Sequence, residues 1–233
     1  MTKGAIFWRK RKMIKTIKWN QVYEKEGNRF TSRINNWEDV IQFFKKNNIG
    51  KVLDLGCGNG THMLDLSQQG FSVTGFDISK SGIELAREKF QQSKLEADFL
   101  VGSMHKKFPF QDGHFDAVIC LRTLNHGEKY QVQKTINEIW RVIKPGGYIF
   151  ISTIKIFGQK SRQGNGILNQ MPVNFIAPYT YRPLEGKEAD IIHFVFNKKA
   201  LLHMFKNFTV VKFWLDIGEK HWEKYYCLLA QKL

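Results

Sequence analysis

Apolar runs of strand type alternate along the chain with segments in which apolar residues recur at helical spacing. Trp37, Val40, Ile41 and Phe44 form such a set, because steps of three or four residues return to one face of a helix. The following run, 52–55, has the character of a buried parallel strand. Further strands are predicted at 70–77, 97–101, 115–120, 148–153, 208–215 and 224–231, with helices at 61–69, 79–90, 132–143 and 198–206. In a chain of 233 residues, this alternation predicts one large α/β domain.

One segment, 155–190, interrupts this alternation because it has no clear period. It holds glycines, prolines and aromatic residues, among them Gly158, Gly164, Gly166, Pro172, Phe175, Pro178, Tyr179, Tyr181 and Pro183. A long irregular insertion in a compact domain is usually functional or disordered. We therefore interpret 155–190 as a segment that covers a substrate.

Three glycines at alternate positions, Gly56, Gly58 and Gly60, follow the first strand and precede a helix. Glycine lets a backbone turn tightly and approach a ligand, which can then bind the N–H groups of the helix. The spacing is GxGxG, whereas the dinucleotide-binding motif is GxGxxG. Asp54 would also repel a pyrophosphate, but it suits a ligand with ammonium and sulfonium charges. Asp77 ends the second strand 21 residues after Gly56, close to the interval at which an acid meets a ribose.

The stretch from Asp54 to Gly60, together with Asp77, resembles the first motif and the ribose-binding acid of class I S-adenosylmethionine-dependent methyltransferases. Two further stretches match the small-molecule (type 11/25-like) branch: Phe108–Cys120, a proline-aromatic turn and strand, and the Pro-Gly-Gly of 145–147. The resemblance covers nearly the whole chain from about Trp19. It implies an α/β fold with a Rossmann-like, doubly wound, seven-stranded, mostly parallel sheet, an antiparallel C-terminal hairpin strand and helices on both faces. The whole chain, 1–233, is then a single methyltransferase domain.

The resemblance also implies the cofactor, S-adenosylmethionine, with S-adenosylhomocysteine as the product. Its expected binding residues are Asp54, Gly56, Cys57, Gly58, Asn59, Asp77, Ile78, Ser103, Met104 and Leu121. Ser103 departs from the family pattern, since an acid is common there for binding the adenine. This departure weakens the side-chain contact and leaves the backbone N–H of Met104 as a donor.

The acceptor side is expected at the end of the fourth strand and in the covering segments. Trp19 and Tyr23 are candidate lid residues, and Arg122 and Tyr181 are candidate substrate contacts, although packing is an alternative role for the lid residues. Methyl transfer is an in-line displacement, for which a general base is optional. The candidate bases are His126 and His193. For either one, a hydrogen-bonded structural role is an equal alternative.

The composition, with 42% hydrophobic residues, supports a substantial core. No apolar run reaches the length needed to cross a bilayer, and the start lacks the apolar stretch of a signal peptide. The three cysteines, Cys57, Cys120 and Cys227, show no zinc-ligand spacing. We therefore expect reduced thiols, a cytoplasmic location and no metal.

The net charge of +15 is unusual, and seven basic residues precede the first acid, Glu24. Residues 1–30 are interpreted as a basic arm and lid. The arm suits RNA, anionic lipid or an acidic substrate, or it is a solvated tail. Neither an Asn/Asp-Pro-Pro-aromatic motif after the fourth strand nor a proline followed by cysteine is present. The small-molecule reading is thus favoured over an RNA methyltransferase or a non-catalytic cofactor-binding protein, and a nicotinamide-dependent reductase ranks last.

Overall fold

The protein is described by a computed structural model, which covers residues 18–27, 32–155, 164–168, 171–218 and 224–233, with only the backbone of 164–168. Residues 1–17 and 28–30 of the predicted basic arm and lid, 1–30, therefore lie outside the described residues. A helical segment, residues 18–26, comes first. The further helices are α2 (Trp37–Lys46), α3 (Thr61–Gln68), α4 (Lys80–Gln92), α5 (Lys129–Val142) and α6 (Lys198–Met204).

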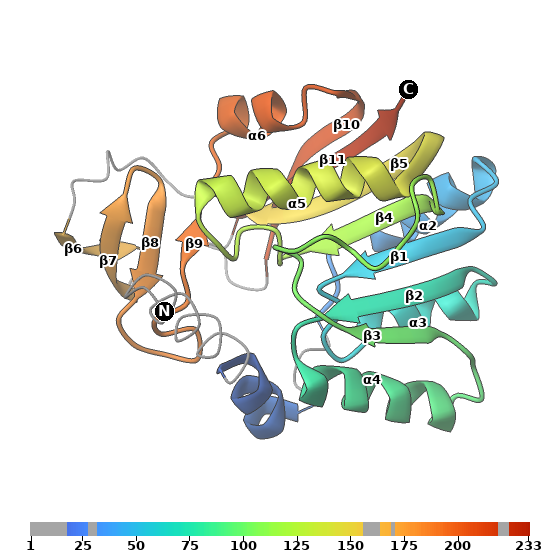
Figure 1. Ribbon diagram of the computed structural model, residues 1–233, viewed down its shortest axis with the longest axis horizontal. Helices are drawn as coiled ribbons and strands as arrows, with labels where there is room; N and C mark the ends of the chain where they lie inside the picture. The colour runs from blue at the N-terminus through green and yellow to red at the C-terminus, as the bar shows by residue number, and fades with distance from the viewer. Residues whose placement is uncertain (1–17, 28–31, 156–163, 169–170, 219–223) are drawn as a thin grey trace, which may run out of the picture.

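The main sheet has seven strands in the order β10-β11-β5-β4-β1-β2-β3 (Figure 1). They are β1 (Lys51–Leu55), β2 (Ser72–Asp77), β3 (Asp98–Val101), β4 (Phe115–Leu121), β5 (Ile143–Ile154), β10 (Phe208–Ile217) and β11 (Lys224–Lys232). Strands β1 to β5 pair in parallel, and β11 is antiparallel to both β5 and β10. The predicted doubly wound sheet with its antiparallel C-terminal strand is confirmed.

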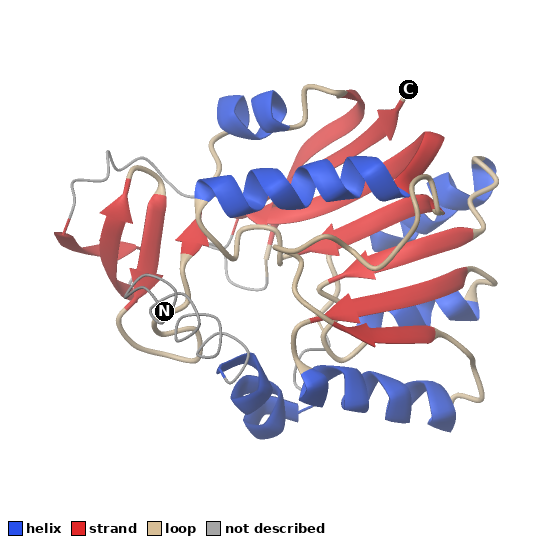
Figure 2. Cartoon of the chain, viewed as in Figure 1, coloured by secondary structure: helices blue, strands red, loops and turns tan. Residues whose placement is uncertain are grey.

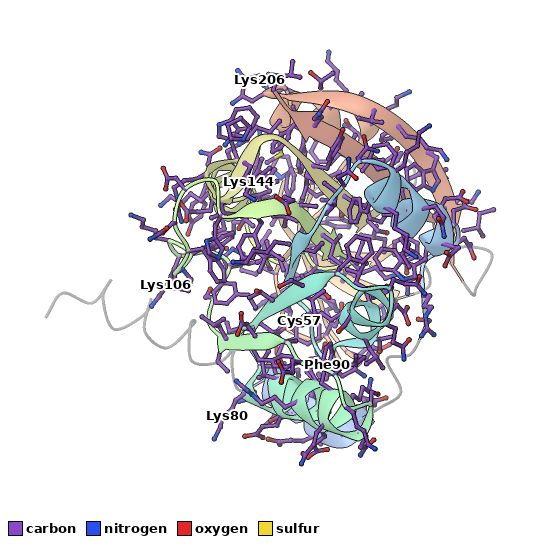
Figure 3. The ribbon with its side chains drawn as sticks, turned by 90° about the vertical axis from the view of Figure 1, so that its right-hand side faces the viewer. Cys57, Lys80, Phe90, Lys106, Lys144 and Lys206 are labelled. Atoms are coloured by element: carbon purple, nitrogen blue, oxygen red, sulfur yellow. The ribbon has the colours of Figure 1, made fainter. Side chains whose placement is uncertain are left out.

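Helices cover both faces of this sheet (Figure 2). One apolar core joins α2, α3 and α4 to the sheet, and it includes the predicted face of α2 with Trp37 and Phe44. The other core joins α5 and α6, through residues such as Ile136 and Leu201, to the opposite face. Figure 3 labels Cys57 and Phe90 among the interior side chains. All three cysteines are free and buried.

Local interactions explain where two of these elements begin. The hydroxyl of Ser79 accepts a hydrogen bond from the N–H of Gly82 at 3.0 Å, so Ser79 caps α4 as predicted. The proline-aromatic turn before β4 is held by the Arg141 guanidinium, which donates to the carbonyls of Phe108 and Phe110. Arg141 also forms an ion pair with Asp112 at 2.7 Å.

Strand β5 begins at Ile143, five residues before the predicted start at Tyr148. Ile143 pairs with Phe115, and the register with β4 then shifts, so 144–147 form an irregularity within the strand instead of a break before it. A Cβ atom at Gly147 would lie 2.6 Å from the backbone oxygen of Asp116. This close approach explains why glycine stands there.

The expectation that 155–190 is irregular was wrong. The chain forms a second, antiparallel sheet in the order β6-β7-β8-β9, made of β6 (Gly164–Leu168), β7 (Met171–Ala177), β8 (Thr180–Pro183) and β9 (His193–Phe194). Its own small core contains Val173, Phe175 and Tyr181. These strands are short, and Pro172 and Pro183 lie within them, which hid the alternation. The second sheet lies beyond the carboxyl ends of the parallel strands (Figure 1).

Candidate active site

The glycine turn between β1 and α3 has the backbone that its sequence predicts. Gly56, Gly58 and Gly60 have φ values of 78°, 54° and 73°, in the left-handed region that favours glycine. A Cβ at Gly56 would lie 2.2 Å from the methyl carbon of Thr123. The turn therefore packs directly against the segment that follows β4.

Asp77 is buried at the end of β2 and faces this turn. Its carboxylate accepts hydrogen bonds from the backbone N–H groups of Gly58 at 2.9 Å and Ser79 at 2.8 Å. Burial raises the pKa of Asp77, and these two hydrogen bonds act in the opposite direction. A carboxylate has lone pairs for more than two donors, so Asp77 can also accept from ligand hydroxyls.

Asp54 is also buried, within β1 beneath the turn. Burial, followed by the nearby charge of Asp77, raises the pKa of Asp54 to about 8. The Asp54 carboxyl is therefore mostly protonated at neutral pH. A cationic ligand nearby would favour its ionised form, and this matches the charge argument made from the sequence.

The helical segment 18–26 is attached to the start of α4 by side-chain hydrogen bonds. The Asn20 side-chain oxygen accepts from the Ser79 hydroxyl at 2.9 Å, and Glu24 accepts from the Ser81 hydroxyl at 3.0 Å. Tyr23 lies over the glycine turn, since a Cβ at Gly58 would meet its hydroxyl oxygen at 2.0 Å. Burial raises the pKa of Tyr23 well above its usual value. This segment therefore closes one side of the site.

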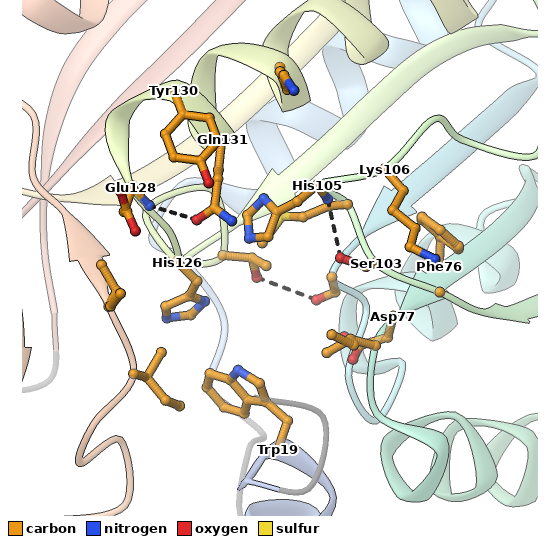
Figure 4. Close-up of a pocket in the computed structure, with 18 of the residues that line it drawn as sticks. Trp19, Phe76, Asp77, Ser103, His105, Lys106, His126, Glu128, Tyr130 and Gln131 are labelled. Atoms are coloured by element: carbon orange, nitrogen blue, oxygen red, sulfur yellow. Dashed lines mark hydrogen bonds between the residues drawn. The ribbon is translucent and has the colours of Figure 1, made fainter. Parts of the chain in front are cut away.

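A cavity of about 360 Å³ connects the glycine turn with the end of β4. Figure 4 shows Asp77 and Ser103 on one side of it, His126 and Glu128 on the other, and Trp19 below. The rings of Trp19 and His126 are 5.0 Å apart. The volume lies within the range of small-molecule sites, about 300–1,000 Å³.

Eight of the residues predicted for the site line this cavity: Trp19, Tyr23, Gly56, Asp77, Ile78, Ser103, Met104 and His126. The other predicted residues do not line it: Asp54, Cys57, Gly58, Asn59, Leu121, Arg122, Tyr181 and His193. Gly58 still contributes through its bond to Asp77. The Arg122 guanidinium instead lies 4.7 Å from the Tyr225 ring and donates to the Ser32 hydroxyl.

His193 lies behind His126, outside the cavity wall. Its ring is 4.9 Å from that of His126 and is stacked on Tyr181 at 5.0 Å. Its Nδ1 is 3.1 Å from the side-chain amide of Asn125, and its Nε2 is 3.4 Å from a carboxylate oxygen of Glu188. Both ring nitrogens of His193 thus face protein groups, whereas His126 faces the cavity.

Sequence reasoning missed several lining residues: Phe76, Gly102, His105, Lys106, Thr123, Glu128, Tyr130, Gln131, Lys134, Ile191 and Ile192. Glu128, Tyr130, Gln131 and Lys134 come after β4, at the start of α5. Open α/β sheets bind ligands at the carboxyl ends of their strands, and this rule could have identified these residues. Ile191 and Ile192 come from the chain that leads to β9, and no local pattern connects them with this site.

Residues 52–147 match the model of the methyltransferase domain family. This stretch contains the glycine turn, Asp77 and His126, and it runs from β1 into β5. This stretch is therefore similar to that family, and the seven-stranded sheet around it has the class I S-adenosylmethionine-dependent methyltransferase fold.

Among the similar proteins, a ubiquinone biosynthesis O-methyltransferase from Pseudomonas aeruginosa is 36% identical over 104 residues, which are 45% of this chain and 44% of that protein. A ubiquinone biosynthesis O-methyltransferase from Rickettsia typhi is 39% identical over 110 residues, covering 46% of this chain and 43% of that protein. The chain thus spans less than half the length of the curated relatives it matches.

Solved structures extend the similarity over most of the fold. A SAM-dependent methyltransferase from Methanosarcina mazei has a TM-score of 0.61 at 26% identity, covering 78% of this chain and 92% of that one. The 1,6-didemethyltoxoflavin-N1-methyltransferase of Burkholderia thailandensis, solved with S-adenosylhomocysteine, has a TM-score of 0.69 at 15% identity, covering 94% and 88%. The second likeness concerns the fold alone.

Proposed function

We propose that this protein is an S-adenosylmethionine-dependent methyltransferase that acts on a small-molecule acceptor. The observation that carries this proposal is the continuous cavity from Asp77, at the glycine turn, to His126 at the end of β4. The cofactor occupies the half with Asp77, Ile78 and Met104. Its ribose hydroxyls bind Asp77, and its cationic end lies toward Asp54.

The acceptor occupies the other half, between Trp19, Tyr130, Ile191 and Ile192. Two of these side chains are aromatic and two are aliphatic, so they favour a flat, largely apolar acceptor. The names of the relatives, O-methyltransferases of ubiquinone biosynthesis, support oxygen as the methylated atom. The acceptor oxygen attacks the methyl carbon in line, while the carbon–sulfur electron pair moves to sulfur. We assign the activation of the acceptor hydroxyl to His126.

Labelled methyl transfer into a cell extract tests the acceptor class. The purified protein is incubated with the extract and methyl-labelled S-adenosylmethionine, and the label is measured in small-molecule, RNA and protein fractions. Label in the small-molecule fraction supports the proposal. Label confined to RNA would instead support the RNA methyltransferase alternative, which the net charge of +15 favours. The cytoplasmic location stays a prediction. No helix in the described part of the chain is long and apolar enough to cross a membrane.

The variant Asp77→Ala tests the cofactor assignment. Loss of two hydrogen bonds between a carboxylate and ribose hydroxyls, each of about 1.5–3 kcal/mol, should weaken S-adenosylmethionine binding by at least about 100-fold. Isothermal titration calorimetry measures this change. Asp98→Ala is the matched control, because Asp98 is an exposed acid on the neighbouring strand. Unchanged affinity in Asp77→Ala, with a normal melting curve, would remove Asp77 from the cofactor site.

A further inference from the structure

We propose that His126, Glu188 and His193 form a binding site for a divalent metal ion of the zinc type, at the acceptor end of the cavity. One ligand atom from each of the three side chains lies within 4.8 Å of the other two. The two histidines are buried, and the Glu188 side chain is 33% exposed. A modest closing movement of this triangle would bring the three atoms to the bond lengths of about 2.0–2.2 Å that zinc requires.

The backbone holds the two histidines together. His126 and His193 form an antiparallel bridge between the end of β4 and strand β9 of the second sheet. Next to it, the N–H of Phe194 donates to the carbonyl of Asn125 at 2.8 Å. Glu188 lies on the turn that leads into β9, and its carboxylate is 3.4 Å from Nε2 of His193. Main-chain pairing therefore fixes the separation of the two imidazoles.

The side chains around the cluster hold the two rings in place. The Asn125 amide nitrogen lies 3.1 Å from Nδ1 of His193 and donates to it, so Nε2 carries the proton and faces Glu188. Metal binding through Nε2 requires the Asn125 amide to turn, so that its oxygen accepts from the N–H of Nδ1. Such contacts from a second layer of residues fix the ring and set which nitrogen binds the metal. Tyr181 stacks on one ring and Trp19 lies against the other. These contacts keep the two rings 4.9 Å apart, so the closing movement onto an ion is short.

The chemistry of the donors selects the ion. Two imidazoles and one carboxylate suit zinc and its neighbours in the first transition row, whereas magnesium and calcium prefer oxygen ligands alone. Three protein ligands are also the usual number in zinc sites that keep a position open for water or substrate. His126 lines the cavity, so the open position is on the cavity side.

The consequence for the reaction rests on the proposed function. An acceptor hydroxyl bound to the ion releases its proton to water more readily, as metal-bound water does. The resulting oxygen anion takes the methyl group as the carbon–sulfur electron pair moves to sulfur. His126 then activates the acceptor as a ligand of the ion. Metal binding itself depends only on the three side chains, so it can be tested without any acceptor.

The test uses the whole, tag-free protein after removal of metals by dialysis against a chelator. Zinc binding is measured by equilibrium dialysis with elemental analysis, and cobalt(II) serves as the spectroscopic probe because its visible absorption reports nitrogen and oxygen ligation. The expected result is about one tightly bound ion per chain, with visible cobalt bands. Wild-type protein that binds neither ion at micromolar concentrations would overturn the proposal.

Variants identify the ligands. Glu188→Gln and His193→Gln should each weaken zinc binding by at least about tenfold, since loss of even a supporting residue typically costs 10–100-fold. Glu185→Gln and His203→Gln are the controls, because both residues are exposed and lie outside the cluster. Equal weakening in the control variants would show adventitious binding and contradict the proposal. Melting curves establish that each variant is folded.

The metal site and the proposed function fail in different ways. S-adenosylmethionine binding and methyl transfer are measured in the same protein with and without bound zinc. Zinc bound as predicted, with no methyl transfer to any fraction, would leave the metal site standing and contradict the proposed function. Methyl transfer by a protein that binds no zinc would support the proposed function and contradict the metal site.

Discussion

The Asp54 side chain is buried, and burial disfavours its charged form. The stability of the protein should therefore depend on pH. The pKa of Asp54 is raised from about 3.9 in an unfolded chain to about 8. The folded protein therefore holds a proton that the unfolded chain releases. The part of the free energy of unfolding that depends on protonated Asp54 is fully present below about pH 4, and it is lost as the pH rises toward 8.

The variant Asp54→Asn removes this titration. Without cofactor, the melting temperature of Asp54→Asn relative to wild type should rise steadily from pH 5 to pH 8, and level off above that. Differential scanning calorimetry at several pH values measures the difference. S-adenosylmethionine should reduce the difference in melting temperature between Asp54→Asn and wild type, because its positive charge favours the ionised Asp54 carboxylate of the wild type. A difference that is independent of pH would contradict the raised pKa.

Gly56 tests the close packing of the glycine turn. Alanine at this position adopts a left-handed backbone and places its Cβ 2.2 Å from the methyl carbon of Thr123. Gly70→Ala is the matched control, since Gly70 has φ of 89° with no atom within 4 Å of a Cβ. Both variants bear the backbone strain, and Gly56→Ala adds about 1–3 kcal/mol of overpacking. Urea denaturation compares them; equal losses of stability would mean that the turn tolerates a methyl group.

At the scale of elements, Ser79 serves both α4 and the helical segment 18–26. Its hydroxyl accepts from the Gly82 N–H and donates to Asn20. Ser79→Ala removes both interactions and should cost about 0.5–2 kcal/mol for the cap alone. Asn20→Ala leaves the cap intact and removes only the contacts of the segment, from the Ser79 hydroxyl at 2.9 Å and from the Ser81 N–H at 3.4 Å, so its cost should be smaller.

The double variant tests whether Asn20 stabilises the fold mainly through the Ser79 hydroxyl. Asn20→Ala/Ser79→Ala should be only slightly less stable than Ser79→Ala alone, because the Ser79 change has already broken the shorter Asn20 contact and leaves only the 3.4 Å one from the Ser81 N–H. Denaturation midpoints of the four proteins supply the comparison. Simple addition of the two single effects would show that Asn20 supports the fold through other contacts.

These elements also show which parts of the structure can be predicted from sequence. The face of α2, the Ser79 cap and the glycine turn depend on residues close together in the chain, and their spacing was sufficient. The second sheet depends on pairings between short strands that contain prolines. Their alternation of apolar and polar residues was therefore not recognisable in the sequence. His126 and His193 are separated by 67 residues and meet through a backbone bridge, so no local spacing indicates their cluster with Glu188.

At the scale of the whole molecule, three parts of the chain that are distant in sequence enclose one cavity. The main sheet provides the glycine turn and Asp77, the segment 18–26 closes one side, and the approach to β9 provides Ile191 and Ile192. The half that we propose for the cofactor is built mainly by residues 52–147, and the half that we propose for the acceptor also draws on segments outside this stretch.

The net charge of +15 provides a way to separate the two candidate acceptor classes. Figure 3 shows Lys80, Lys106, Lys144 and Lys206 at separate places around the molecule. RNA held by such charges should bind about 10- to 1,000-fold more weakly when salt rises from about 50 to about 200 mM, because bound counterions are released. An apolar acceptor enclosed in the cavity has no such charge term, so its KM should change less than about twofold over the same range.

Filter binding with RNA and steady-state kinetics with the small-molecule acceptor found in the extract supply these two measurements. We expect RNA retention at low salt only, with methyl transfer to the small molecule at both salt concentrations. Removal of residues 1–18 should then reduce RNA retention and leave KM for the small molecule unchanged. If methyl transfer itself fell in parallel with RNA binding as salt rose, the acceptor would be recognised through its phosphates. The cavity between Trp19 and Ile191 would then serve a flipped or single-stranded base instead of a free small molecule.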